Sequence, residues 1–322
     1  MLFGASPVLA PTGSAARDVV FEQSVAERIV ERVSLEAGRS PASPESVAAD
    51  GNAFPRRAST SRDGNVIAIE RDDGTAKEIW LKDLRSRTQQ IVVRVESSGI
   101  ASATISADGT RIAYNRDATD VLGSGGIGTV VETAGGVPKE ICKGCRLWGF
   151  MPDSRRAIAT VDAPGIRLID VISGEATDVM TGADARVDRP SVSPDGRWLA
   201  FRRQAGNGLK TYLTSMAAAS VASAQPIDEP TITGRPAGWS PDSRLLYLLL
   251  DSDGFRCLWA QRVDPVSGAL VGSPTVARHL HDVVGVSTSF GNAVTSQGFL
   301  YEAMSVRSSL WRVRPAVTSP GS

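Results

Sequence analysis

The chain has 322 residues, 42% of them hydrophobic and 22% charged, which is enough apolar material for a sizeable core and excludes a disordered protein. Its 35 Lys and Arg residues balance 35 Asp and Glu residues, so no net charge attracts nucleic acid or an anionic membrane. The longest apolar run, residues 245–250, is far shorter than the roughly 20 residues that cross a bilayer. We therefore expect neither nucleic-acid binding nor membrane insertion.

The two ends of the chain differ from the rest. Residues 1–24 are predicted to be a disordered leader, or the cut edge of a longer protein. They make a poor signal peptide, because no Lys or Arg precedes the apolar part and Pro7 and Pro11 interrupt it. Residues 315–322 are predicted to be a disordered tail. The sequence thus predicts one domain over residues 25–314.

The first predicted element covers residues 29–38, which resemble a strand followed by a glycine turn. The four-residue spacing of Val25, Ile29 and Val33 also fits a short helix, and the strand is favoured. Residues 40–57, with Pro41, Pro44 and Pro55, are then predicted to be a linker.

A short turn motif recurs along the middle of the chain. Its copies are Ser-Arg-Asp-Gly at 61–64, Ser-Ala-Asp-Gly at 106–109, Met-Pro-Asp-Ser at 151–154, Ser-Pro-Asp-Gly at 193–196 and Ser-Pro-Asp-Ser at 240–243. The spacings between the aspartates are 45, 45, 42 and 47 residues, within the range of four-stranded propeller blades. The turn aspartates are Asp63, Asp108, Asp153, Asp195 and Asp242.

The chemistry of the motif suits a hairpin corner. Pro presets φ at the second turn position, Asp accepts bonds from nearby backbone N–H groups, and Gly accepts a positive φ. An apolar strand follows each turn, at residues 66–69, 111–114, 157–159, 198–201 and 245–248. Third strands are predicted at residues 79–84, 129–133, 166–171 and 258–263.

The last unit is degenerate. Residues 298–302 and 310–313 are predicted to be its second and third strands. The fold class is therefore all-β: a β-propeller of about six four-stranded blades, with seven as the alternative. An N-terminal strand is expected to close the ring, because an open array would expose unpaired strand edges.

The repeats resemble those of the TolB-like propeller family, related to WD40-type repeats. The resemblance is carried by Ser-Pro-Asp-Gly-Arg-Trp-Leu-Ala-Phe at 193–201 and Ser-Pro-Asp-Ser-Arg-Leu-Leu-Tyr at 240–247, and it covers about residues 55–314. Arg62 and Ala107 depart from it where the family has Pro, and Met151 where it has Ser. The resemblance implies a bacterial, periplasmic propeller that binds proteins, often through its channel mouth. In that family the propeller is also found fused to a peptidase, a kinase or a DNA-binding module.

Both histidines of the chain, His279 and His281, lie in one short segment. Two positions apart on a strand they would face the same side and reach one metal ion or substrate. No third ligand is spaced nearby, so a polar loop between blades is favoured and no metal is predicted. There is no Gly-x-Ser-x-Gly nucleophile elbow for a hydrolase triad.

The three cysteines are too few for a disulfide framework. Cys142 and Cys145 have the spacing of half a zinc site, and they also suit a disulfide in an exported protein or two thiols in a reduced one. Cys257 is predicted to be buried. Six tryptophans recur about once per unit, and Trp80, Trp259 and Trp311 share a place in third strands, which favours packing between blades.

These patterns favour a non-enzymatic scaffold that binds a protein or peptide at the channel mouth or rim, as the sensory or scaffold part of a larger signalling or envelope protein. Candidate binding residues are His279, His281, Arg202, Arg203 and Lys210. No cofactor and no catalytic residue is predicted, and a monomer is expected. The alternative is a propeller enzyme, a lyase or hydrolase, in which the histidines and several carboxylates would converge in the channel.

Overall fold

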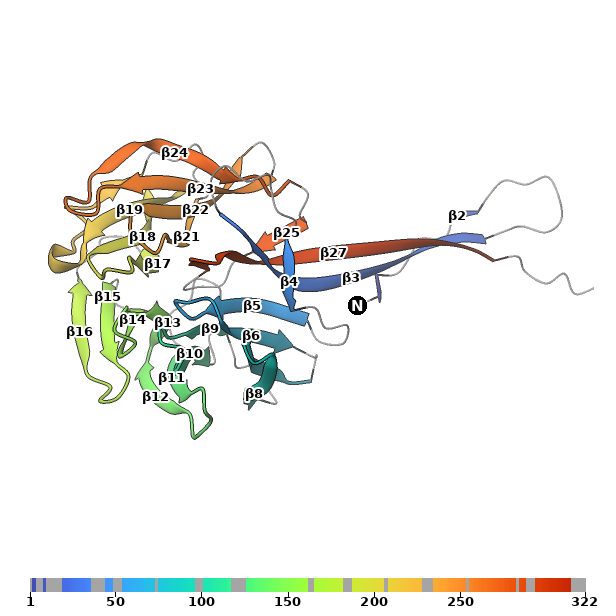
Figure 1. Ribbon diagram of the computed structural model, residues 1–322, viewed down its shortest axis with the longest axis horizontal. Coiled ribbons are helices and arrows are strands. Elements are labelled where there is room, and N and C mark those ends of the chain that lie inside the picture. The colour runs from blue at the N-terminus through green and yellow to red at the C-terminus, as the bar shows by residue number, and fades with distance from the viewer. Residues whose placement is uncertain are drawn as a thin grey trace, which may run out of the picture.

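The chain folds into six β-sheets arranged as blades around a central axis (Figure 1). The computed structural model describes residues 2–3, 8–9, 19–35, 44–48, 54–72, 75–95, 101–116, 126–161, 165–181, 187–205, 208–227, 234–252, 255–281, 284–287 and 293–313. Within them, the 3₁₀ turn Met216–Ala218 is the only helical element, and no helix has the length and hydropathy of a bilayer-crossing segment. The prediction of an all-β propeller is confirmed.

Each of the first five blades is a four-stranded antiparallel sheet whose strands follow one another along the chain from the axis outward. Blade 1 holds β5 (Phe54–Thr60), β6 (Val66–Asp72), β7 (Lys77–Asp83) and β8 (Thr88–Val95). Blade 2 holds β9 (Ala101–Ile105), β10 (Arg111–Arg116), β11 (Ile127–Glu132) and β12 (Lys139–Lys143). Blade 3 holds β13 (Cys145–Phe150), β14 (Arg156–Val161), β15 (Gly165–Asp170) and β16 (Ala176–Met180). Blade 4 holds β17 (Val187–Val192), β18 (Trp198–Ala205), β19 (Gly208–Ser215) and β20 (Gln225–Pro226). Blade 5 holds β21 (Arg235–Trp239), β22 (Leu245–Ser252), β23 (Phe255–Val263) and β24 (Leu270–Arg278).

The sixth blade joins the two ends of the chain. The C-terminal part supplies the inner segments β25 (Val284–Ser287) and β26 (Val294–Thr295) and the second strand β27 (Gly298–Val313). The N-terminal part supplies β3 (Val19–Val33) and β4 (Glu45–Ala48) as third and fourth strands. Two N-terminal strands therefore close the ring, and the strand prediction for residues 29–33 is confirmed.

Two sequence predictions for this blade are wrong. Residues 310–313 do not form a separate third strand, because β27 continues through them and pairs with β3 along its whole length. The expected linker 40–57 contains β4 and the start of β5; Pro44 immediately precedes β4, a place that a short outer strand tolerates.

The paired ends of β3 and β27 project from the ring as a long two-stranded ribbon (Figure 1). Short strands β1 (Leu2–Phe3) and β2 (Val8–Leu9) pair with β3. Trp311 is 52% exposed on β27, so the prediction that it packs between blades is wrong. It lies on the ribbon and not on a third strand.

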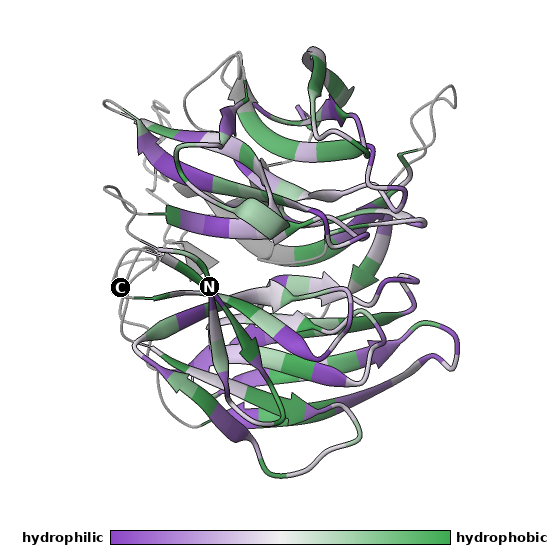
Figure 2. Ribbon diagram, turned by 90° about the vertical axis from the view of Figure 1, so that its left-hand side faces the viewer, coloured by the Kyte–Doolittle hydropathy of each residue, from purple (hydrophilic) through white to green (hydrophobic). Residues whose placement is uncertain are grey.

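The core lies between neighbouring blades. Hydrophobic stretches run through the strands of the stacked blades, and hydrophilic residues are frequent at the turns (Figure 2). Each interface between blades has its own cluster of buried side chains, as expected for strands covered on both faces. At the closing interface, Val30, Val47 and Leu300 of blade 6 pack against Ile67 and Ile69 of blade 1.

The repeated turns share one hydrogen-bond pattern. In the first, the Ser61 hydroxyl donates to Asp63 Oδ1 at 2.7 Å and accepts from the Val66 N–H at 3.1 Å, while Gly64 has a φ of 75°. The Asp63 carboxylate also accepts from the Asn65 backbone N–H. Asp108, Asp195 and Asp242 occupy the same place and accept from Ser106, Ser193 and Ser240. Asp153 accepts from the backbone N–H groups of Arg155 and Arg156.

The Asp63 turn predicts a loss of stability in acid. Bonds from Ser61 and Asn65 lower the pKa of Asp63 to about 2. A carboxyl with a lowered folded pKa stabilises the fold above its unfolded pKa of about 3.9, and this contribution is lost as the pH falls toward 2. We expect Asp63→Asn to make the melting temperature fall less steeply between pH 4 and pH 2 in thermal unfolding. Identical pH curves for the variant and the wild type would contradict this role.

Candidate functional site

The turns meet one another around one end of the central axis. The Arg62 N–H donates to the Ala107 carbonyl at 2.9 Å, and the Asp108 N–H donates to the Ser154 hydroxyl at 3.1 Å. Gln297 of blade 6 donates to the Asp63 carbonyl at 2.7 Å. These bonds join blade 6 to blade 1, blade 1 to blade 2 and blade 2 to blade 3, so this rim is held in place before any ligand arrives.

A cavity of about 290 Å³ opens inside this rim. Its lining includes the apolar side chains of Phe150, Met151, Val192, Trp239 and Val294, which we call its apolar floor, and the carboxylates of Asp195 and Asp242. Because every blade contributes, the cavity lies on the propeller axis, and we call it the turn-end mouth. Its residues from blades 1 to 6 include Arg62, Ala107, Pro152, Pro194, Pro241 and Thr295.

Arg62 crosses the turn-end mouth. From blade 1 its guanidinium donates to the carbonyls of Pro152 in blade 3 and Pro194 in blade 4, both at 3.4 Å. These distances exceed the usual 2.7–3.2 Å of an N–H···O bond, so Arg62 is held loosely. A carboxylate would bind this guanidinium more strongly than a neutral carbonyl does.

The other end of the channel carries a cluster of arginines. Arg146, Arg189 and Arg235 lie near the starts of the inner strands β13, β17 and β21, which run toward the turns. Asp188 lies opposite Arg202 in the β17–β18 pairing, with 3.8 Å between Asp188 Oδ1 and Arg202 Nε. Arg189 Nε is 3.9 Å from Asp188 Oδ2. The charges of Arg146, Arg202, Arg235 and Asp188 all act on Arg189, and we call these five residues, from blades 3, 4 and 5, the arginine cluster.

Arg189 is held in a strained backbone conformation. Its φ is 50°, in the left-handed region, at a bulge between Asp188 and Ser191. Bulges re-aim side chains, and such strain persists only where the surroundings impose it. Burial, followed by the positive charge of Arg235, lowers the pKa of Arg189 well below its usual range, and Asp188 opposes this shift.

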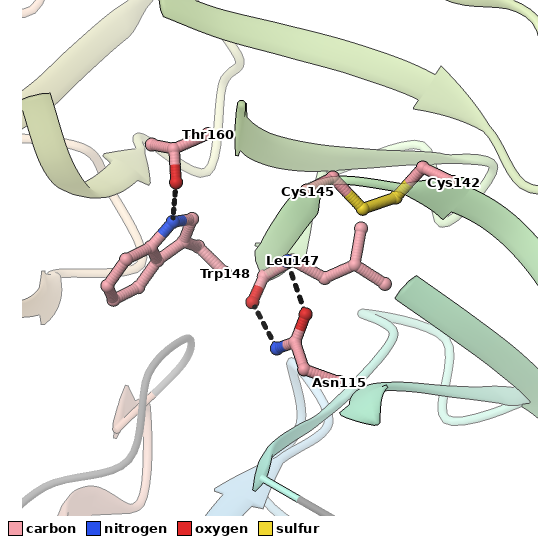
Figure 3. The surroundings of a disulfide bond; sticks show 6 residues. All are labelled: Asn115, Cys142, Cys145, Leu147, Trp148 and Thr160. Carbon is pink, nitrogen blue, oxygen red and sulfur yellow. Dashed lines mark hydrogen bonds between the residues drawn. A yellow bond between two sulfur atoms is a disulfide. The ribbon is translucent and has the colours of Figure 1, made fainter. Parts of the chain in front are cut away.

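Trp148 provides a surface for two of these arginines. The guanidinium carbons of Arg146 and Arg189 lie 4.9 and 5.8 Å from the centre of its ring. Trp148 Nε1 donates to Thr160 Oγ1 at 2.8 Å (Figure 3). Nearby, the side chain of Asn115 in blade 2 bonds both the N–H and the carbonyl of Leu147 in blade 3 (Figure 3).

The structure resolves the question that the cysteine spacing left open. Cys142 and Cys145 form a disulfide between the end of blade 2 and the start of blade 3 (Figure 3). A Cβ at Gly128 would lie 2.5 Å from Cys142 Sγ, so glycine leaves room for the sulfur. Cys257 is buried, as predicted, and is not part of a disulfide.

The candidate binding residues do not gather at one place. Arg202 belongs to the arginine cluster, with a side chain only 11% exposed, so it is not a rim charge. Arg203 faces Tyr212, 6.0 Å from its ring centre, and Lys210 is exposed opposite Arg203 in the strand register. The described lining of the turn-end mouth contains none of the three.

His279 and His281 lie at the outer edge of blade 5, after β24, and both are exposed. The described lining of the turn-end mouth contains no histidine. The channel enzyme hypothesis required the histidines to converge there with several carboxylates, and although Asp195 and Asp242 line this cavity, the structure places both histidines elsewhere.

Apart from Arg202, the arginines of the cluster were not predicted as binding residues from the sequence, and neither was Arg62 or Ala107 of the turn-end mouth, although a signal for both sites was present. Arg62 and Ala107 were noticed only as departures from the Pro of the turn motif. Arg146 and Arg235 each stand seven residues before a turn aspartate, and Arg189 stands six before. Residues at a similar distance before each turn aspartate occupy equivalent positions on the inner strands, and these positions face the axis.

No protein-family model and no curated protein matches the chain. Solved structures do match it. A putative TolB from Agrobacterium tumefaciens aligns with a TM-score of 0.64 at 16% identity, over 88% of this chain and 99% of that one. The chain has a TolB-like propeller fold.

Two other matches show how widely this TolB-like fold is used. TolB from Acinetobacter baumannii aligns with a TM-score of 0.58 at 14% identity, over 88% of this chain, which spans 66% of that structure. An oligogalacturonate lyase in complex with manganese aligns with a TM-score of 0.53 at 12% identity, over 94% of this chain and 97% of that one. At these identities the likeness shows the fold, which does not imply function.

Proposed function

We propose that the protein is a non-enzymatic binding platform whose turn-end mouth receives a short segment of a partner protein. The observation that carries this proposal is the cavity to which all six blades contribute, with an apolar floor and Arg62 across it. A volume of 290 Å³ lies at the lower end of ligand pockets, which run from about 300 to 1,000 Å³. It suits one or two side chains of a peptide better than a large small molecule.

The partner segment carries a carboxylate. Arg62 is a cation loosely bonded to two backbone carbonyls, and a carboxylate that replaces them gains a charge-assisted bond. The apolar floor, with Met151 and Trp239, takes a hydrophobic side chain beside it. Asp195 and Asp242 also line the mouth, and the positive potential of the arginine cluster further along the axis opposes theirs, so we propose a single carboxylate placed at Arg62 and not a strongly acidic segment.

We place the protein in an oxidising compartment, the periplasm. The Cys142–Cys145 disulfide supports this location, because disulfides persist in such compartments and are rare where thiols are kept reduced. A TolB-like platform there would act as the sensory or scaffold part of an envelope assembly, and we expect the chain itself to be monomeric.

Filling the turn-end mouth is expected to abolish peptide binding. Peptides selected from a displayed random library on the wild-type chain would be titrated against Ala107→Trp, which places a large ring in the mouth at a turn position. The bond from the Arg62 N–H to the Ala107 carbonyl is made by backbone atoms, so the substitution does not remove it. We expect affinity to fall by about tenfold or more, and Arg62→Gln to weaken peptides with a carboxylate selectively.

The matched control is Ile172→Trp. Ile172 is 54% exposed on a turn between the third and fourth strands of blade 3, away from the lining of the mouth. This variant should bind the selected peptides as the wild type does. The proposed site would be refuted if the peptides bound Ala107→Trp with wild-type affinity, or if Ala107→Trp and Ile172→Trp lost the same affinity.

A further inference from the structure

Three residues with metal-binding side chains meet at the outer edge of blade 5. Cys257 lies on β23, and His279 and His281 directly follow β24. Leu258 pairs with Arg278 in the sheet, so Cys257 and His279 are brought together by the register of the two strands. Leu280, between the histidines, is buried in the cluster between blades 5 and 6. The segment that carries the histidines is therefore anchored.

Two of the three distances between the ligand atoms match those around a tetrahedral ion, and the third pair, Cys257 Sγ and His281 Nε2, lies within 4.8 Å and would move closer when an ion binds. His279 Nδ1 lies 3.3 Å from His281 Nε2 and 3.6 Å from Cys257 Sγ, and all three atoms lie within 4.8 Å of one another. Zinc binds nitrogen at about 2.0–2.1 Å and sulfur at about 2.3 Å, which sets tetrahedral N···N and N···S edges near 3.3 and 3.6 Å. The N···N distance of 3.3 Å lies at the long end for a direct hydrogen bond, and it also fits two nitrogens bound to one ion.

Burial and chemistry also fit a metal site. Cys257 is 2% exposed, whereas both histidines are exposed, so an ion can enter from the solvent side and keep one open position. A cysteine nucleophile paired with His279 is disfavoured, because a substrate would not reach a thiol this deeply buried. One thiolate and two imidazoles form a ligand set of the kind that zinc takes.

We propose that Cys257, His279 and His281 bind one Zn²⁺ ion, with water as the fourth ligand. Binding converts the Cys257 thiol to a thiolate and releases its proton to solvent, while both imidazoles bind in the neutral form. The ion ties the third strand of blade 5 to the segment that leaves its fourth strand toward blade 6. This site is separate from the turn-end mouth, so either proposal can fail without the other.

The test is metal titration of the full-length, chelator-treated protein with the Cys142–Cys145 disulfide intact. Zn²⁺ is expected to bind with a stoichiometry of one and to raise the melting temperature, because a ligand that binds only the native state stabilises it. Co²⁺ should give the charge-transfer absorption of a cobalt–thiolate bond. Cys257→Ser should remove this absorption, and His279→Gln and His281→Gln should each weaken Zn²⁺ binding by tenfold or more.

The matched control is the double variant Cys142→Ser/Cys145→Ser, which removes the other two cysteine sulfurs of the chain. It should bind both ions as the wild type does. Because the histidines are exposed, their glutamine variants should fold even if Cys257→Ser does not. The proposal is overturned if wild-type protein gives no cobalt–thiolate absorption, if that absorption persists in Cys257→Ser, or if both glutamine variants bind Zn²⁺ as tightly as the wild type.

Discussion

Replacing Asp188 by Asn is expected to lower the free energy of unfolding by about 3–5 kcal/mol. Asp188 is 4% exposed, and it is the carboxylate that opposes the effect of Arg146, Arg202 and Arg235 on Arg189. Without its charge, four partly or fully buried guanidinium groups repel one another in a medium that screens them poorly. Urea unfolding of the variant and the wild type measures the difference.

The control for Asp188→Asn is Asp178→Asn. Asp178 also pairs with an arginine, at 2.5 Å from Arg167 Nε, but its side chain is 50% exposed. Exposed pairs of this kind contribute about 0–1 kcal/mol. If both variants lose the same free energy of unfolding, Asp188 contributes no more to stability than a carboxylate in an ordinary surface ion pair.

The second large effect is expected at Gly298, where the ring closes. Gly298 begins β27 with a φ of 126°, and an added Cβ would lie 2.2 Å from the Val33 carbonyl oxygen of β3. Gly298→Ala therefore strains the backbone and pushes apart the two strands that join the chain ends. We expect a loss of about 3 kcal/mol or more, visible as a fall of roughly 5 °C or more in melting temperature.

The control Gly135→Ala separates the effect of backbone strain from the effect of the clash between the added Cβ and β3. Gly135 also has a positive φ, 96°, but nothing lies within 4 Å of an added Cβ. This control should lose only the part of the stability that comes from backbone strain, about 1–3 kcal/mol. A Gly298 variant no less stable than the Gly135 variant would contradict the close approach of β27 and β3.

The fold could be predicted from the sequence because a single local rule repeats. Each Ser-x-Asp turn is specified by its own residues, and a period near 45 leaves room for four strands. The same rule could not place residues 310–313 or 45–48, because strand order in blade 6 is decided by pairing between the two ends of the chain. No local pattern encodes that pairing.

The candidate sites were harder to predict for a related reason. Arg62 and Ala107 are close to the turn motif in sequence, but their meeting at the mouth depends on the closure of the ring. No metal site was predicted at His279 and His281, because no third ligand lies nearby in the sequence. Cys257, 22 residues before His279, becomes its neighbour through strand register.

The central claim is that the turn-end mouth holds the partner. The most direct test places a photoreactive amino acid at position 107 of the full chain in its native cells, and the same amino acid at position 172. The account predicts crosslinks to one distinct protein from position 107, suppressed by a peptide selected on the wild-type chain, and none from position 172. Crosslinks from position 172 alone, or crosslinks from position 107 that the peptide leaves unchanged, would contradict it.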